Sequence, residues 1–239
     1  VLANVLALTS GKVTADVTSL TAAELVTAIK EKKTVNALTV TVADDAAATT
    51  ASDLKILDAK TSVTVDASAV TAITGTAAEL KTVLAAKTIT LDTTAVAVTV
   101  DGKVSAADLN TIAKATGGVV TAEIEGSAAA LNAALKDVNS SDLISVTLTG
   151  TTATAKDILE LNAKCPDFNR DSLQTITGTF AQMKLIADSP LNQALTITDT
   201  IKATDSDITA LNSITNFASG AVKATVEGSA AVLAKLTAS

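Results

Sequence analysis

The chain has 239 residues, 48% of them hydrophobic, and a net charge of −7 at pH 7, a composition that excludes an intrinsically disordered protein. Histidine is absent and cysteine occurs once, which excludes the commonest general base, the usual zinc ligands and an intramolecular disulfide. An acidic chain with three phenylalanines and no other aromatic residue lacks the positive charge and the stacking surfaces that nucleic acid requires.

One sequence phrase returns about every 24 to 28 residues. Each copy joins a short Thr/Val/Ile segment, a turn and an Ala-rich segment with leucines at helical spacing. The clearest pair is 120–131 (VTAEIEGSAAAL) and 222–233 (VKATVEGSAAVL). Self-similarity at such a period is typical of stacked repeat architectures.

In chain order, the first units are the least regular. A strand at 13–17 precedes a helix at about 21–30, and a strand at 38–42 precedes a helix at about 52–59. Residues 1–10 fit as a partial unit. Later units are marked by the turn after each strand, at Gly75, Gly102, Gly126, Gly150, Gly178, near Thr200 and at Gly228.

The strand and helix segments differ in their hydrophobic period. Ile144, Val146 and Leu148 alternate with polar residues, which predicts a strand with one buried face. Leu80 and Val83 are spaced for one face of a short helix. A serine or threonine often precedes the helical segment and predicts its N-cap: Thr76, Ser105, Ser127, Thr179 and Ser229, with Ser19 or Thr21 in the first unit.

Two units contain a second strand in the segment that returns from the helix. This strand is predicted in 60–66, before the strand at 69–74, and in 87–92, before the strand at 95–100. Elsewhere the return segment is a loop, as in 115–118.

These patterns predict an α/β fold, because a strand, a helix and a parallel strand at this spacing form βα units. We expect a repeat solenoid of strand–turn–short helix units, with a parallel sheet on one side and the helices on another. Residues 1–239 would then form a single array of roughly nine units. The alternative is a set of separate small α/β domains.

The segment 165–171 interrupts the repeats and contains Cys165, Phe168 and Arg170. One interpretation is a protruding loop that makes a specific contact or an intermolecular disulfide. The other is a non-repetitive insertion in a return segment, with Phe168 filling a gap. A nucleophilic cysteine is not expected, since the chain has no histidine to activate it.

Aspartates in predicted turns are the candidate metal ligands. Asp44, Asp45, Asp205 and Asp207 could hold Ca²⁺ through their carboxylate oxygens. No Asp-x-Asp-x-Asp-Gly loop is present, however, and aspartate in a turn ordinarily serves turn or cap chemistry. We therefore expect no cofactor, with calcium as the alternative.

Polar residues on the outer strand faces also suggest functions. Glu123 and Glu125 point outward without implying a pocket, so we expect no acid–base pair. Pairs of the form Thr-x-Thr resemble the surface of ice-binding solenoids, although threonine is also a good strand former. These pairs are Thr39/Thr41, Thr88/Thr90, Thr147/Thr149, Thr175/Thr177 and Thr196/Thr198, interrupted by Glu123, Glu125, Lys223 and Glu227.

Two phrases carry a resemblance to a known class of protein. The segments 74–80 (TGTAAEL) and 125–129 (EGSAA) resemble the Thr/Ala-rich repeats of large secreted or cell-surface proteins of bacteria, notably cyanobacteria. The resemblance implies an extracellular or cell-surface location and supplies no catalytic residues. The chain begins with Val1 rather than Met, which fits a processed product or a segment of a longer protein.

The sequence therefore predicts a structural protein rather than an enzyme. We expect a subunit of an extracellular filament or surface layer that assembles with copies of itself through head-to-tail or lateral contacts. The alternative is a spacer or binding module of a large bacterial adhesin or matrix protein, holding a cell-surface glycan or protein. No apolar run reaches the length of a membrane span, so membrane insertion is not expected.

Overall fold

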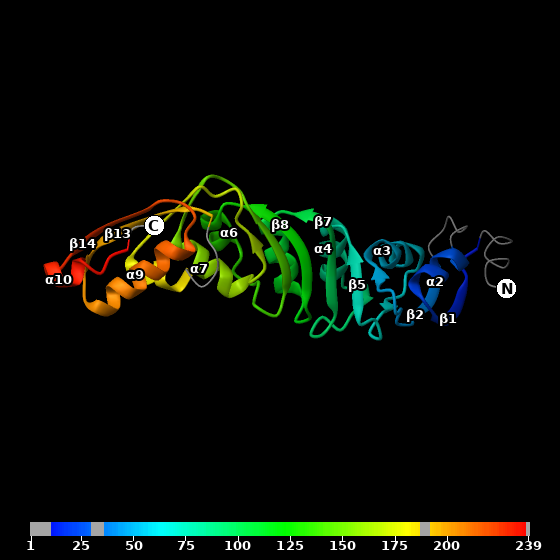
Figure 1. The fold of residues 1–239 in the computed structure, drawn as a ribbon. Helices are drawn as coiled ribbons and strands as arrows, with labels where there is room; N and C mark the ends of the chain where they lie inside the picture. Colours follow the sequence, from blue (N-terminus) through cyan, green and yellow to red (C-terminus); the bar gives the residue numbers. More distant parts are fainter. Residues whose placement is uncertain (1–10, 30–35, 187–191, 238–239) are drawn as a thin grey trace. The chain divides into compact units, whose positions relative to one another are not determined.

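The computed structural model of the chain describes residues 11–29, 36–186 and 192–237, which form an α/β fold with parallel sheets (Figure 1). The predicted partial unit at 1–10 lies outside the described residues. The chain divides into two compact units. Unit 1 contains Val1–Glu123 and Ser141–Ile144, and unit 2 contains Ile124–Ser140 and Ser145–Ser239.

Unit 1 contains two sets of parallel strands. The strands of the first set are β1 (Thr14–Leu20), β2 (Ala37–Val42), β4 (Val65–Asp66) and β6 (Ile89–Thr90), paired in this order. Those of the second set are β3 (Thr49–Thr50), β5 (Ala72–Gly75) and β7 (Ala97–Val104). The helices are α2 (Ala22–Ile29), α3 (Ala51–Lys60), α4 (Ala77–Ala85) and α5 (Ala106–Ala115), and each contacts the next. The boundary between the two units falls within β8 (Val120–Gly126), after Glu123.

Unit 2 is built in the same way. One open sheet has the parallel strand order β10 (Thr152–Thr154), β12 (Thr175–Gly178), β13 (Ala194–Lys202) and β14 (Val222–Glu227). In addition, β9 (Leu143–Leu148) pairs with β11 (Phe168–Asn169) at Val146 and Thr147. The helices are α6 (Ala128–Ala134), α7 (Ala155–Lys164), α8 (Phe180–Ile186), α9 (Asp205–Phe217) and α10 (Ala230–Leu233).

Paired strands lie about one sequence repeat apart. Ala72 is the register partner of Ala97, Thr152 of Thr175, and Leu195 of Val222. The second strands predicted in 60–66 and 87–92 are confirmed as β4 and β6, and they pair with each other. The sequence analysis did not predict β3 and β10, which are only two and three residues long.

The N-cap is the most regular position of each sequence repeat. All nine helices of the described residues follow a serine or threonine, and the predicted caps Thr76, Ser105, Ser127 and Ser229 are confirmed. Thr179 also accepts a hydrogen bond from Gln182, and Thr21 rather than Ser19 precedes the first helix. Three caps were not predicted: Thr50, Thr154 and Thr204.

Glycine is a less regular mark than predicted. Gly102 lies inside β7 with φ of 71°, and Gly150 lies between β9 and β10 with φ of 92°. The turn predicted to end the strand at Gly102 is therefore wrong, because β7 continues through it, whereas Gly150 does lie in the turn that follows β9. At Gly178, which ends β12, close packing requires glycine. A Cβ on Gly178 would lie 2.6 Å from the Cβ of Ala155, at the start of the preceding helix.

The core of each unit consists mainly of aliphatic side chains that stand at equivalent positions of successive repeats. The fourth residue after each N-cap is a large apolar side chain that faces the strands and is buried in eight consecutive helices. These residues are Leu25, Leu54, Leu80, Leu109, Leu131, Ile158, Met183 and Ile208. Full burial of such a side chain contributes about 1.5–3 kcal/mol, so this row stabilises helices that are too short to be stable alone.

We predict opposite effects for two adjacent threonines. Thr49 is 2% exposed and its hydroxyl has no hydrogen-bond partner, whereas the hydroxyl of Thr50 accepts a hydrogen bond from Asp53 N at 3.0 Å. Thr49→Val should raise the free energy of unfolding in urea by about 1 kcal/mol, because it removes an unsatisfied buried hydroxyl. Thr50→Val should lower it by about 1 kcal/mol, because it removes a cap. Destabilisation by Thr49→Val would contradict this account of the core.

Candidate functional site

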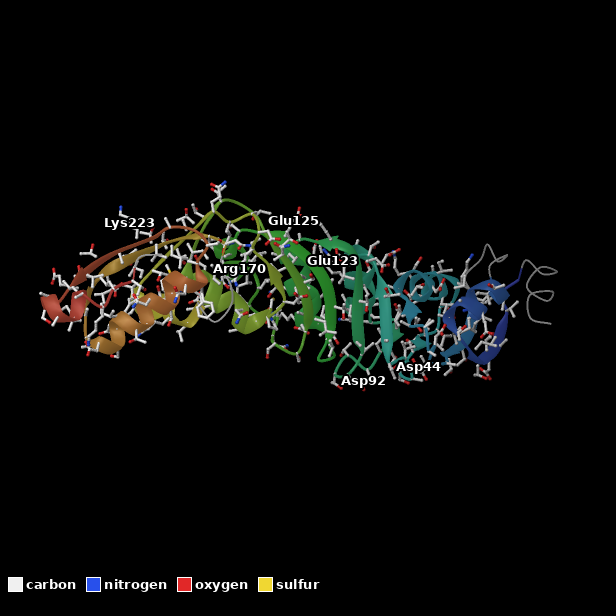
Figure 2. All side chains as sticks on the ribbon, viewed as in Figure 1. Asp44, Asp92, Glu123, Glu125, Arg170 and Lys223 are labelled. Atoms are coloured by element: carbon white, nitrogen blue, oxygen red, sulfur yellow. The ribbon has the colours of Figure 1, made fainter. Side chains whose placement is uncertain are left out.

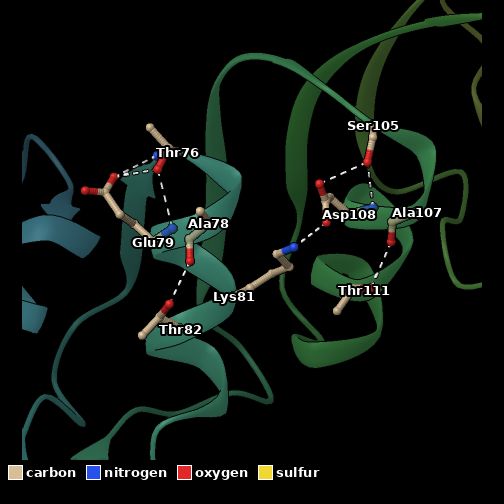
Figure 3. Close-up of polar contacts among 9 residues, drawn as sticks. All are labelled: Thr76, Ala78, Glu79, Lys81, Thr82, Ser105, Ala107, Asp108 and Thr111. Carbon is tan, nitrogen blue, oxygen red and sulfur yellow. Dashed lines mark hydrogen bonds and ion pairs between the residues drawn. The ribbon is translucent and has the colours of Figure 1, made fainter.

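Hydrogen-bonded polar groups gather at helix N-termini of unit 1 (Figure 3). Thr76 Oγ1 accepts a hydrogen bond from Glu79 N at 3.4 Å, and Glu79 Oε2 accepts one from Thr76 N at 3.2 Å. Together these bonds form a capping box. At the next helix, Ser105 Oγ accepts a hydrogen bond from Asp108 N at 3.1 Å. The local sequence Ser/Thr-x-x-Glu/Asp therefore produces the same N-cap hydrogen bond in these two successive repeats, and at Thr76 it also produces the full capping box.

A lysine joins one cap to the next. Lys81 lies five residues after the cap Thr76, and its Nζ forms an ion pair with Asp108, the capping carboxylate of the following helix. Lys55 is in the same position after Thr50, and its positive charge acts on Glu79. We call one set of residues the cap ladder of unit 1. It consists of the caps Thr76 and Ser105, their carboxylates Glu79 and Asp108, and the lysines Lys55 and Lys81.

Unit 2 repeats the arrangement. Thr204 N donates a hydrogen bond to Asp207 Oδ2 at 3.0 Å, and Asp207 N donates one to Thr204 Oγ1 at 3.4 Å. Lys184, five residues after Thr179, acts on Asp207 through its charge. The sequence analysis identified most caps but missed the lysines, although a lysine five residues after an N-cap is a readable signal.

The capping carboxylates titrate below their usual range. The hydrogen bond from the Thr76 hydroxyl lowers the pKa of Glu79, and the one from the Thr204 hydroxyl lowers the pKa of Asp207. The pKa of Asp108 is lowered first by its hydrogen bond with Lys81 and then by the one with Ser105. These groups are therefore ionised at neutral pH and act as hydrogen-bond acceptors at the helix ends.

The four calcium candidates lie in two separate places. In unit 1, Asp44 accepts hydrogen bonds from Thr71 N and Thr71 Oγ1, both at 2.9 Å, and Asp45 Oδ1 accepts one from Ala47 N. In unit 2, Asp205 pairs with Lys235 at 2.6 Å, and Asp207 caps α9. Across the described ranges, no group of three His, Cys, Asp or Glu residues could hold a metal ion. Calcium binding thus stays a prediction.

Other aspartates stabilise the corners between strands of unit 1. Asp92 Oδ1 accepts hydrogen bonds from Thr94 N at 3.1 Å and Thr94 Oγ1 at 2.5 Å, and Asp66 accepts the equivalent pair from Ser68. These bonds, first those from the hydroxyls, lower the pKa of both aspartates. Figure 2 shows Asp44 and Asp92 along the same edge of unit 1. Asp-x-Ser/Thr is the sequence signal for this corner.

The candidate contact loop is integrated into unit 2. Cys165 is fully buried at the end of α7, and its N–H donates a hydrogen bond to Leu161 O at 2.8 Å. Phe168 lies in β11, beside Val146 of β9. Arg170 is half-buried, which lowers its pKa, and its carbonyl accepts a hydrogen bond from Gln193 Nε2 at 3.2 Å. The buried thiol does not offer the surface position that an intermolecular disulfide needs.

The outward threonines do not form one continuous array. Thr177 neighbours Thr196 in the sheet of unit 2, and Lys223 follows Thr196 on β14. In unit 1, Asp66 stands between Thr41 and Thr90. Thr147 lies on β9, and the exposed Glu123 and Glu125 lie on β8 (Figure 2). The five Thr-x-Thr pairs are therefore distributed over different sets of strands.

Two shallow grooves lie between the helix N-termini of unit 2. Each has a volume of about 270 Å³, and both include Thr154 and Thr177. Ser127, Thr152 and Asp157 complete the polar lining of the first, and Lys156, Thr179, Gln182 and Thr198 that of the second. The grooves therefore present hydroxyl, amide and carboxylate groups along the row of caps.

Comparison with known proteins leaves the family open. No family model, curated protein or solved structure matches the chain. Within the described residues, no helix is long and apolar enough to cross a membrane. The resemblance to Thr/Ala-rich surface proteins stays a prediction that depends on short sequence phrases.

The depressed carboxylate pKa values predict loss of stability in acid. Because the folded pKa lies below the ordinary values of 3.8 for aspartate and 4.5 for glutamate, the stabilisation is complete above these values. It is lost as the pH falls through the folded pKa. We expect the Tm to change little between about pH 7 and 5 and to fall below about pH 4.

The triple variant Glu79→Gln/Asp108→Asn/Asp207→Asn tests the source of this loss. Its amides still accept hydrogen bonds from the caps but do not titrate. The Tm of this variant should lie below that of wild type at pH 7, and the difference in Tm should be smaller at pH 3. Glu123→Gln, at an exposed strand position, is the matched control and should follow wild type. A difference in Tm that does not depend on pH would contradict the assignment of the acid-induced loss of stability to these three carboxylates.

Proposed function

We propose that this chain is a structural repeat protein, a solenoid of roughly nine strand–turn–helix units that forms an extracellular filament or surface layer. The observation that supports it best is that strand pairs and side-chain contacts connect neighbouring repeats. In repeat proteins each repeat contacts only its neighbours, and the stacked repeats present an extended, regular surface.

The polar contacts illustrate this spacing. Lys81 and Asp108 are 27 residues apart, and Asn132 Nδ2 donates a hydrogen bond to the carbonyl of Asp157, 25 residues on. Ser172 Oγ bonds to Leu148 O across 24 residues, and Thr61 Oγ1 to Leu38 O across 23. These separations match the sequence period. Polar contacts therefore join neighbouring repeats at several places along the chain.

The chemistry of the contacts also fits a structural role. The ordered carboxylates hold helix ends and strand corners, where their lowered pKa values keep them ionised. The core consists of aliphatic rows, with the cysteine buried among them. The phrases at 74–80 and 125–129 support an extracellular or cell-surface location, by their resemblance to bacterial surface repeats.

The two grooves of unit 2 favour a second candidate function. Hydroxyl and amide groups at Thr154, Thr177 and Gln182 could hydrogen-bond the hydroxyls of a surface glycan. The chain would then be a spacer or binding module of a larger adhesin or matrix protein. Glycan-array binding that Thr154→Val and Thr177→Val abolish would favour this candidate over the first.

Removal of one whole repeat tests the solenoid. Deletion of 76–104 joins Gly75 to Ser105 and so replaces one cap with the next, in register. We expect this variant to fold and to unfold cooperatively in urea, because neighbouring repeats provide equivalent surfaces. Deletion of 76–90 removes α4 and β6 but leaves β7, and should abolish cooperative unfolding. Equal behaviour of the two deletions in circular dichroism would contradict the repeat architecture.

Assembly of the purified chain tests the structural role. We expect ordered fibres or sheets in negative-stain electron microscopy, and we expect the same assemblies in the presence of EDTA. Monodisperse particles at all concentrations would contradict a self-assembling subunit. Assemblies that dissolve in EDTA would instead support the calcium alternative.

A further inference from the structure

An exposed turn lies in the segment that leads from α6 to β9. Residues 139–141 of this turn are all exposed, whereas the residues on either side of them, Val138 and Asp142, are each 4% exposed. Asp142 Oδ1 also accepts a hydrogen bond from Val120 N at 2.9 Å. Buried residues at both ends therefore anchor the turn and leave its three central residues at the surface.

The turn contains a recognisable acceptor sequence. Asn139-Ser140-Ser141 is the one place in the 239 residues where an asparagine is followed, two residues later, by serine or threonine. Enzymes that attach N-linked glycans recognise this tripeptide when its middle residue is not proline. Because the tripeptide is short, its structural context decides its meaning, and the context that a glycan needs is a surface loop. The exposed turn provides that context.

An aspartate two residues before the asparagine extends the pattern. The segment reads Asp137-Val138-Asn139-Ser140-Ser141, and Asp137 is exposed. The oligosaccharyltransferases of bacteria require an acidic side chain at this position in addition to the tripeptide. These two requirements are independent of each other, and the same exposed segment meets both.

The turn is also separate from the regular elements. α6 ends at Ala134 and β9 begins at Leu143, so Asn139 lies outside both. An enzyme can therefore reach Asn139 without breaking the hydrogen bonds of a helix or a strand. A bulky, hydrophilic glycan at this position would extend into solvent and displace no core side chain.

We propose that this turn makes Asn139 the acceptor of an N-linked oligosaccharide in the folded chain. The proposal rests on the extracellular or cell-surface location proposed above, since the transferases act on the outer side of the cell membrane. The donor is an oligosaccharide carried on a lipid diphosphate. Asn139 Nδ2 forms a bond to the anomeric carbon, the bond from that carbon to the diphosphate oxygen breaks, the lipid diphosphate leaves, and one Nδ2 proton is released to solvent.

Transfer to the purified, folded chain tests the inference. A bacterial oligosaccharyltransferase with its lipid-linked oligosaccharide should add one glycan, which peptide mass spectrometry should locate at Asn139. Asn139→Gln, Ser141→Ala and Asp137→Ala should each abolish the transfer, and Ser141→Thr should retain it. Failure of the wild-type chain to accept a glycan, or transfer to Asn139→Gln, would overturn the proposal.

An acceptor sequence placed on a helix is the matched control. Lys164→Ser completes the same pattern around the exposed Asn162, with Glu160 two residues before it. Asn162 lies within α7, so the end of this helix must unwind before the enzyme can hold the segment. In this variant we expect about tenfold lower occupancy at Asn162 than at Asn139, because local unwinding costs free energy. Equal occupancy of the two asparagines would overturn the role of the turn.

Protein isolated from its own cells provides the second test. The peptide that contains Asn139 should carry the mass of an oligosaccharide, and the peptide that contains Asn162 should not. An unmodified Asn139 in protein recovered from the cell surface would overturn the proposal. Recovery of the chain only from the cell interior would contradict the proposed location instead.

Discussion

The stability of each short helix depends on its neighbours. The helices of the described residues contain between 4 and 13 residues, below or near the length at which isolated helices become stable in water. Their caps satisfy the first N–H groups, and their apolar rows pack against strands of the same and adjacent repeats. Contacts between neighbouring repeats, including the cap ladder, therefore provide stability that the isolated helices lack.

The cap ladder shows how one residue can serve two purposes. Asp108 caps its own helix through Ser105 and pairs with Lys81 of the preceding helix. Local helix formation and association between repeats are therefore coupled through a single carboxylate. Such a pair, with both side chains about one-third exposed, contributes only modestly to the free energy of unfolding, and it joins one helix to the next.

The sequence allowed the α/β class, the parallel strands and most helix starts to be predicted. This was possible because the alternation of Ile144, Val146 and Leu148 and the Thr76-x-x-Glu79 box are local signals. The short strands β3 and β10 were missed, since two or three residues carry no readable period. Gly102 was misread as the end of its strand, because glycine with a positive φ also occurs within strands, for example at bulges.

The candidate site was less predictable for a related reason. The Lys81–Asp108 pair joins residues 27 positions apart, and its partners become apparent only after the cap register is known. Cys165 is buried at the end of α7 and β11 pairs with β9, and the irregular segment 165–171 gives no sequence signal for either feature. Contacts within one repeat can therefore be predicted from this sequence, whereas contacts between repeats become apparent only from the fold.

The constant separation of contacts also bears on how fast the chain folds. Pairs about 25 residues apart in a chain of 239 correspond to a relative contact order of about 0.1, a value typical of helical bundles rather than of β-rich proteins. Each new strand closes a loop of similar, modest length, so the entropy lost at each step is nearly the same. A parallel sheet, ordinarily slow to form, is thereby assembled from short-range closures.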